Sequence, residues 1–326
     1  MSDPGSGGRR VSALVEAARG GDPRALARLI TLVENDADEL PEVAAAFAPY
    51  TGTAQVIGLT GAPGVGKSTT TNELVRALRA RGHRVGVLAV DPSSPYTGGA
   101  ILGDRVRMQD HATDTGVYIR SMSSRGHLGG LAAATPQAVR VLEGAGCDVV
   151  LVETVGVGQA EVEVASLADT TLVLLAPGMG DAIQAVKAGI LEVADVFVVN
   201  KADRDGADAT YRDIQGMMGL APRGPGEWRP PVVRAVAAKG EGIDDILAAI
   251  DKHRDWLAAH DELRRRREAR AAAEVEAIAL ATLRARMGSL REGTALPSLA
   301  AAVASGELDP YAAARELLAG LRSSSP

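Results

Sequence analysis

The stretch GAPGVGKS, residues 61 to 68, follows the apolar run QVIGLT and precedes TTTNELVRALRA, which has the spacing of a helix. It matches the phosphate-binding P-loop pattern G-x-x-x-x-G-K-[ST], in the order of strand, glycine-rich turn and helix that the mechanism needs. Gly61, Gly64 and Gly66 have no Cβ, so the backbone can take a positive φ and turn its N–H groups toward a phosphate. The stretch predicts a nucleotide site; a glycine-rich turn with a solvated lysine is the alternative.

Two side chains of this loop have expected roles. Lys67 should reach the β- and γ-phosphates, and we expect it to face solvent and phosphate rather than to lie in the core. The Ser68 hydroxyl should bind Mg2+, which prefers oxygen ligands and keeps several waters. The predicted nucleotide-binding residues of the loop are Gly61, Ala62, Pro63, Gly64, Val65, Gly66, Lys67, Ser68 and Thr69.

The composition is that of a globular protein. The 326 residues are 46% apolar, and 41 acidic against 35 basic residues give a net charge of -6. No overall positive field therefore favours nucleic acid or an anionic membrane as a partner. The single Cys147 excludes an intrachain disulfide and a multi-cysteine zinc site, and we expect it to be a small buried residue in a reducing compartment. Because we find no targeting segment and no apolar run near 18 residues, we expect a cytoplasmic protein.

Apolar runs that alternate with helical patterns predict the fold. These runs are QVIGLT at 55–60, RVGVLAV at 84–90, DVVLVE at 148–153, TTLVLLA at 170–176, DVFVVN at 195–200 and PVVRAVA at 231–237. Continuous apolar strands between helices indicate a mostly parallel sheet that helices cover on both faces. The predicted fold class is α/β, with a P-loop domain over residues 51–250, which the motifs described below predict to be a GTPase domain, and helical extensions at both ends.

The N-terminal extension is expected over residues 1–50. Residues from Val11 to Tyr50 have helical spacing, with Asp22 and Pro23 as the N-cap and first-turn pair of one helix. Residues 1–10 are polar and glycine-rich, and we expect them to lack regular structure.

The C-terminal extension is expected over residues 251–326. RRRREAR at 264–270 should be a solvated helix face, and breaks are expected near 288–297 and at Asp309-Pro310. The apolar residues of 271–320 cannot all pack on a sheet that its own crossover helices already cover, so a second subunit is the expected partner. A cap folded back on its own domain is the alternative.

NKAD at 200–203 follows an apolar strand, at the edge of the sheet where ligands bind in open α/β folds. The Asp203 carboxylate can accept two hydrogen bonds from guanine, whereas adenine lacks that pair of donors. Asn200 should hold the loop and meet the base edge, while the Lys201 stem covers one face of the ring. A helix cap is the alternative for this motif. The weaker motif AAK adds Ala237, Ala238 and Lys239 as candidate base-contacting residues.

ETVGVGQ at 153–159 follows a buried strand, where a GTPase normally carries D-x-x-G. Glu153 can serve Mg2+ directly or through water, and Gly156 can offer its N–H to the γ-phosphate, so both join Lys67 as candidate catalytic residues. Gln159 does not directly follow that glycine, which leaves its role open. Asp91 and Asp104 are further candidates for the Mg2+ shell, and turn-forming acids in loops are the alternative.

The motifs GAPGVGKST, VDPSSPYTGGAILGDRVRM, SRGHLGGL, ETVGVGQAE, PGMGDAIQAVKAGI and NKAD, in this order, closely resemble those of the MeaB/ArgK-type GTPases. These are chaperones of adenosylcobalamin-dependent acyl-CoA mutases such as methylmalonyl-CoA mutase. The resemblance implies a homodimer with a C-terminal dimerisation arm, which gates cofactor delivery to the mutase, protects it, and uses GTP hydrolysis as a clock. It also implies a switch at 177–187 with Asp181, Gln184 and Lys187, whereas Ala182 departs from the acidic residue expected there.

The leading hypothesis is therefore a Mg2+-dependent GTPase that serves a cobalamin-dependent mutase. A small-molecule kinase, the older label of ArgK-like proteins, would need an acceptor pocket and a base beside the γ-phosphate. A nickel metallochaperone GTPase would be expected to carry a His-rich tract or a Cys/His pair. A dimeric scaffold that holds GTP without hydrolysing it is the alternative that is not an enzyme.

Overall fold

The chain folds as an α/β protein whose sheet is entirely parallel. The computed structural model describes residues 4–92, 111, 113–124, 134–154, 160–178, 191–220, 224, 226–292 and 295–323. It divides into two compact units, Met1–Arg267 and Glu268–Pro326. No helix of the described residues is long and apolar enough to cross a lipid bilayer.

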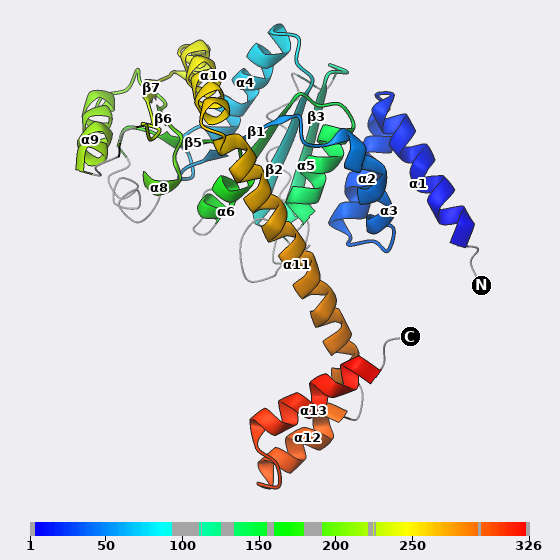
Figure 1. Cartoon of the computed structure of the whole chain (residues 1–326). Helices are drawn as coiled ribbons and strands as arrows, with labels where there is room; N and C mark the ends of the chain where they lie inside the picture. Colours follow the sequence, from blue (N-terminus) through cyan, green and yellow to red (C-terminus); the bar gives the residue numbers. More distant parts are fainter. Residues whose placement is uncertain are drawn as a thin grey trace. The chain divides into compact units, whose positions relative to one another are not determined.

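The first unit is built on a seven-stranded sheet with the order β3-β2-β4-β1-β5-β6-β7 (Figure 1). The strands are β1 Gln55–Thr60, β2 Val85–Pro92, β3 Val117–Ser124, β4 Val149–Thr154, β5 Thr170–Leu175, β6 Val196–Val199 and β7 Val232–Arg234. Every neighbouring pair of strands is parallel, so all carboxyl ends meet at one edge. Six of the strands match the apolar runs of the sequence, and the predicted α/β class is confirmed.

The seventh strand, β3, was missed by the apolar pattern. Its sequence VYIRSMSS mixes polar and apolar residues, and among the described strands it pairs only with β2, at the end of the sheet. Arg120 in this strand pairs with Glu34 of the N-terminal helices. A strand at the edge of a sheet is partly open to solvent and to covering helices, which removes the continuous apolar signal of a central strand.

Strand β1 lies in the middle of the sheet, and its side chains alternate between two cores. Val56 belongs to the core on one face, while Ile57 and Leu59 belong to the core on the other. Gly58 lies opposite α6 (Ala160–Leu167), where an added Cβ would be 2.8 Å from Val164 Cγ2. The helix therefore packs directly on the backbone of the strand that leads into the phosphate-binding loop.

Helices cover both faces of the sheet, as predicted. The helices α4 (Lys67–Ala80) and α10 (Ile243–Ala259) cover one face, with Leu74 and Ile246 in their shared core. On the other face lie α5 (Ala134–Gly144), α6, α8 (Leu191–Val193) and α9 (Ala207–Leu220). Both faces are buried, which explains why the central strands are continuous apolar runs.

The N-terminal helices pack against α5 on one face of the sheet. They are α1 Pro4–Arg19, α2 Pro23–Glu34, α3 Leu40–Phe47 and the short 3-10 helix η1 Ala48–Tyr50. Asp22 caps α2 by accepting a hydrogen bond from the Arg24 N–H at 2.8 Å, as the sequence predicted. The expectation that residues 1–10 lack regular structure is wrong from Pro4 onward, because proline suits the first turn of a helix and α1 begins there.

The long helix α11 (Glu262–Glu292) begins with the basic run that was predicted to be a solvated face. That prediction holds for Arg264 and Arg265, whose side chains are 59% and 65% exposed. It is wrong for Arg266, which binds Asp195 at 3.0 Å, and for Arg267, which binds Asp169 at 2.9 Å. The two aspartates come directly before β6 and β5, so these arginines bind the amino ends of central strands.

The second unit contains the rest of α11, then α12 (Ala295–Ala304) and α13 (Pro310–Ser323), which pack on each other. Asp309 accepts hydrogen bonds from the N–H groups of Tyr311 and Ala312, so the predicted break at Asp309-Pro310 is a helix N-cap. Large apolar side chains of this unit are exposed, including Val275 at 68% and Leu283 at 50%.

Candidate nucleotide-binding site

The loop between β1 and α4 has the backbone that its glycines predicted. Gly61, Gly64 and Gly66 have φ values of 138°, 81° and 98°. A Cβ at Gly61 would clash with the Leu174 carbonyl oxygen of β5, and one at Gly66 would clash with the Asn200 amide. Helix α4 starts directly after the loop, and the first N–H groups of a helix have no partner within it. The loop is thus shaped for an anion at the helix N-terminus.

The Lys67 side chain, from the first residue of α4, folds onto the loop and is not open to solvent. Its Nζ donates to the carbonyl oxygens of Gly61 at 2.6 Å and Ala62 at 3.1 Å. The residue is only 7% exposed, which corrects the expectation that it faces solvent. Carbonyl oxygens accept hydrogen bonds from the ammonium group, so the charge is buried together with acceptors. The positive charge is therefore held at the loop.

Ser68 and Glu153 meet although they are far apart in sequence. Glu153 is the penultimate residue of β4 and is 4% exposed. The Ser68 hydroxyl lies 2.6 Å from Glu153 Oε1, and the Thr71 hydroxyl lies 2.8 Å from Oε2. Thr71 was not singled out from the sequence; a hydroxyl one helical turn after Ser68 is the signal that could have found it.

Asn200 joins three segments of the site. Its Nδ2 donates to the Val65 carbonyl oxygen at 2.8 Å, and its Oδ1 accepts from the Ala237 N–H at 3.0 Å. The side chain is 2% exposed. Ala237 begins the 3-10 helix η4 (Ala237–Lys239), which also contains Ala238. The phosphate-binding loop, NKAD and AAK are thus held together by one amide group.

Lys201 and Asp203 lie on the same loop after β6. Lys201 has φ of 57° and its Nζ donates to the Gly64 carbonyl oxygen at 2.6 Å. Lys239 Nζ lies 3.1 Å from Asp203 Oδ2. The hydrogen bond from Lys239 lowers the pKa of Asp203, and the same bond raises the pKa of Lys239. Asp203 is therefore a carboxylate, able to accept hydrogen bonds.

The remaining predicted site residues divide into those that the structure describes and those that it does not. Asp91 is in β2, where its backbone is in register with Ser123 of β3. Pro63 and Thr69 lie in the loop and in the first turn of α4. The described ranges do not include Asp104, Gly156, Gln159, Asp181, Ala182, Gln184 and Lys187.

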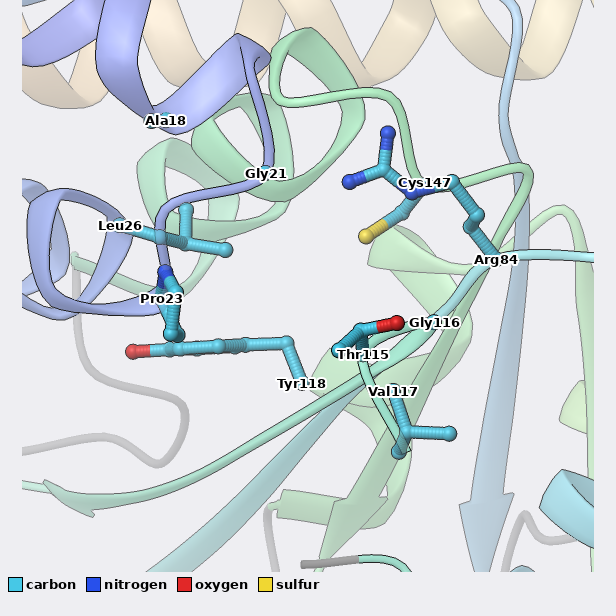
Figure 2. Close-up of a pocket in the computed structure, with 10 residues that line it drawn as sticks. All are labelled: Ala18, Gly21, Pro23, Leu26, Arg84, Thr115, Gly116, Val117, Tyr118 and Cys147. Carbon is cyan, nitrogen blue, oxygen red and sulfur yellow. The ribbon is translucent and has the colours of Figure 1, made fainter. Parts of the chain in front are cut away.

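A small cavity lies at the opposite, amino edge of the sheet. It holds about 30 Å³ and is lined by residues of the N-terminal helices and by residues near the starts of β2, β3 and β4. Figure 2 shows the Cys147 sulfur pointing into it, across from Leu26 and Tyr118. Cys147 is buried, as expected, and burial raises the pKa of its thiol to about 12. Such a space fits a water molecule and is too small for a nucleotide.

Known proteins resemble this chain in sequence and in fold. A Pyrococcus abyssi protein whose name assigns it to the GTPases is 46% identical over 94% of this chain and 96% of its own. GTPase ArgK of Escherichia coli K12 is 39% identical over 77% of this chain and 78% of its own. A solved structure titled LAO/AO transport system kinase covers 99% of both chains, with a TM-score of 0.70 and 28% identity.

The match to a family model identifies the chain. Residues 26–291 match the model described as methylmalonyl Co-A mutase-associated GTPase MeaB. This range includes the phosphate-binding loop, Glu153 and NKAD, and the resemblance of the sequence motifs is confirmed. The chain therefore belongs to the MeaB family of P-loop GTPases.

Proposed function

We propose that this GTPase depends on Mg2+ and is the chaperone of an adenosylcobalamin-dependent acyl-CoA mutase of the methylmalonyl-CoA mutase type. It gates loading of the cofactor and protects the mutase. The description of the matching family supports this partner. A mouse relative, 38% identical over 65% of this chain and 52% of its own, is named methylmalonic aciduria type A homolog.

The observation that carries the nucleotide part of the proposal is the position of Asn200. Because its amide contacts both Val65 and Ala237, the base-binding and phosphate-binding segments form one site. In this site Asp203 accepts hydrogen bonds from the N1–H and the amino group of guanine, and the Lys201 stem covers the ring. Ala237, Ala238 and Lys239 border the base.

The phosphates occupy the loop from Gly61 to Thr69. Backbone N–H groups there donate to the β-phosphate, and Lys67 donates to β- and γ-phosphate oxygens. Gly156 offers its N–H to the γ-phosphate. Since catalysis of phosphoryl transfer is mainly positioning and charge stabilisation, Lys67, Glu153 and Gly156 are the proposed catalytic residues.

The donors next to the loop fit Mg2+. The Ser68 hydroxyl and the buried Glu153 carboxylate, 2.6 Å apart, are hard oxygen donors, and Asp91 and Asp104 are further candidates. Among the described residues no group of three or more His, Cys, Asp and Glu could hold a metal alone. Mg2+ in such sites takes phosphate oxygens and waters besides one or two protein ligands, so no such group is required. When bound, it neutralises charge on the β- and γ-phosphates.

Communication with the mutase is assigned to the segment 177–187, and the proposed oligomeric state is a homodimer. Asp181, Gln184 and Lys187 are its proposed switch residues. Nucleotide can shift a conformational equilibrium only through different affinities for two states, so the mutase must bind the GTP and GDP forms differently. By linkage the mutase changes nucleotide affinity by the same factor, typically about 5- to 150-fold.

The test is phosphate release from GTP with and without purified methylmalonyl-CoA mutase. We expect the mutase to accelerate release, and Lys187→Ala to lose acceleration while its basal rate stays near that of the wild type. Lys252→Ala, at an exposed position of α10, is the matched control. Equal acceleration in Lys187→Ala removes this segment from the signal. No acceleration by any cobalamin-dependent mutase refutes the chaperone role.

A kinase is the second candidate, because the structure that covers 99% of this chain is titled a transport system kinase. A kinase transfers the γ-phosphoryl group to an acceptor, whereas a GTPase transfers it to water. With γ-labelled GTP in a cell extract, we expect the label in free phosphate. Label accumulating on a protein or small molecule, and absent with Lys67→Ala, would favour the kinase.

A further inference from the structure

Two hydroxyl groups of one helix bind the two oxygens of the Glu153 carboxylate. Ser68 and Thr71 lie one turn apart on α4, at 2.6 Å from Oε1 and 2.8 Å from Oε2. Glu153 is 4% exposed and Thr71 is fully buried, so solvent does not compete at Thr71. A buried carboxylate with both oxygens engaged has little freedom to rotate.

The Thr71 hydroxyl has two possible acceptors, one in its own helix and one on Glu153. The Thr71 hydroxyl also lies 3.0 Å from the Lys67 carbonyl oxygen four residues back, a bond that helical threonines commonly make. A hydroxyl has one proton, so the Thr71 hydroxyl can donate to one of these two oxygens at a time. The shorter distance, 2.8 Å, is to the carboxylate. Thr71 therefore acts on Glu153 and not only on its own helix.

Thr70 provides the comparison within the same helix. It is fully buried, as Thr71 is, and its hydroxyl lies 3.0 Å from the Gly66 carbonyl oxygen four residues back. Among the described residues this carbonyl is the hydrogen-bond partner of the Thr70 hydroxyl, which forms no hydrogen bond with a carboxylate. The two threonines thus share burial and the backbone bond, and they differ in the contact with Glu153.

A glutamate at this strand end needs more support than an aspartate. Its side chain has one more rotatable bond, so more conformational freedom must be lost to hold the carboxylate in one place. The carboxylate also reaches about 1.5 Å farther from the strand. The second hydroxyl, from Thr71, restricts the added torsion and leaves Oε1 facing Ser68.

We propose that Thr71 is a positioning residue that holds the Glu153 carboxylate against Ser68 and thereby sets the affinity of the site for Mg2+. This inference rests on the proposed function, in which Ser68 and Glu153 serve the metal. With Oε2 held by Thr71, Oε1 accepts the Ser68 proton, and the Ser68 lone pairs point away from the carboxylate. Partners that orient metal ligands typically change metal affinity or activity about 10- to 100-fold.

The test is a Mg2+ titration of nucleotide binding that needs no turnover. The dissociation rate of a fluorescent GDP is measured at increasing free Mg2+, for the wild type and Thr71→Val, which keeps the shape and removes the hydroxyl. We expect the midpoint of the Mg2+ titration to lie at least about 10-fold higher in Thr71→Val than in the wild type. The affinity for GDP in EDTA should be unchanged. Thr71→Ser, which restores a hydroxyl, should return the midpoint close to that of the wild type.

The controls separate positioning from helix stability. Thr70→Val removes the same backbone bond and should titrate as the wild type does. In a Glu153→Gln background Thr71→Val should add little, because the carboxylate it positions is gone. If Thr71→Val does not fold, Thr71→Ala, with a residue that favours helices, takes its place.

Three results would overturn the inference. The first is a folded Thr71→Val whose Mg2+ midpoint equals that of the wild type, and the second is a Thr70→Val whose midpoint shifts as much as that of Thr71→Val. The third is a double variant in which the shifts of Thr71→Val and Glu153→Gln add up. Failure of the proposed function looks different, since the wild type itself would then bind GDP without dependence on Mg2+. That result would also overturn the role of Thr71.

Discussion

The carboxylate of Asp203 is available to read the base. Its hydrogen bond with Lys239 lowers its pKa, so it is ionised near neutral pH and can only accept hydrogen bonds. We predict that Asp203→Asn lowers GTP affinity by roughly 100-fold or more and raises affinity for xanthine nucleotides, because the amide offers a donor where the carboxylate accepted. Competition between GTP and XTP for a fluorescent GDP measures both effects.

Asp205 is the matched control for this substitution. It lies two residues further along the same loop and is exposed. Asp205→Asn removes the same charge and should leave the preference for GTP unchanged. If both variants change the preference equally, local charge and not base recognition is responsible.

His253 is a buried imidazole whose protonation opposes folding. It is fully buried, 2.9 Å from the Thr170 hydroxyl at Nδ1 and 3.2 Å from Asp195 at Nε2. Burial, aided by the charge of Arg266, lowers its pKa from 6.5 to about 4, although Asp195 and Asp169 act in the opposite direction. Between these two pH values the unfolded chain binds a proton that the folded chain does not.

Stability should therefore fall as the pH drops from about 6.5 to about 4, with His253 contributing up to about 3 kcal/mol of that loss. The slope of the free energy of unfolding with pH reports how many more protons the unfolded chain binds than the folded chain. We predict that His253→Phe lowers this number by close to one in this window. Urea unfolding at several pH values measures it. His260→Phe, at an exposed position, should keep the wild-type dependence; the same dependence in His253→Phe would contradict the prediction.

At the scale of the element, the start of α11 is bound to the sheet through two arginines. Arg267 pairs with Asp169, whose side chain is 2% exposed. Removing the cation takes the ion pair from a buried carboxylate, which then keeps only hydrogen bonds to neutral groups such as the Val56 N–H, and this costs far more than breaking a surface pair. We predict that Arg267→Met lowers the free energy of unfolding by roughly 3 kcal/mol.

Arg265, in the same basic run, gives the control for this prediction. Its side chain is 65% exposed and pairs with Glu262 at 3.5 Å. Arg265→Met should change the free energy of unfolding by about 0.5 kcal/mol or less. The fluorescence of Trp228, whose Nε1 donates to the Asp195 carbonyl oxygen at 2.7 Å, follows unfolding at this edge of the sheet. Similar losses in both variants would show that the pair with Asp169 is not special.

At the scale of the whole molecule, the second unit exposes apolar side chains that a partner should cover. On α11, Val275 is 68% exposed, Ile278 48% and Leu283 50%. We predict that the full chain is a dimer and that Val275→Glu with Ile278→Glu shifts it toward the monomer, since charges in an apolar interface are costly. Light scattering after size exclusion measures the mass of each.

Lys252→Glu, on α10 of the first unit, adds charge at an exposed position and should leave the dimer intact. A wild-type chain that is a monomer at every concentration would disprove the dimer. A dimer that persists in the double glutamate variant would place the interface away from these residues.

The sequence by itself determined the features that depend on neighbours along the chain. The positive φ angles of Gly61, Gly64 and Gly66, the N-cap at Asp22 and six of the strands were all predicted. Each follows from short-range chemistry, namely a missing Cβ, a side chain near free N–H groups, or the periodicity of a buried strand. The nucleotide loop and the α/β class follow from these local signals.

Only the tertiary structure decided which distant residues meet. Glu153 with Thr71, and Asn200 with Val65 and Ala237, are brought together by the strand order β3-β2-β4-β1-β5-β6-β7. Arg267 meets Asp169 because the start of α11 lies beside the start of β5. No local pattern encodes the strand order. Periodicity indicates on which face of a strand a residue lies, but it does not indicate which other strand is the neighbour. The bound arginines of α11 were misjudged for the same reason, because the carboxylates beside them come from distant parts of the chain. The buried Lys67 was misjudged although its acceptors, the Gly61 and Ala62 carbonyl oxygens, are close in sequence, because the fold of the loop decides where they point.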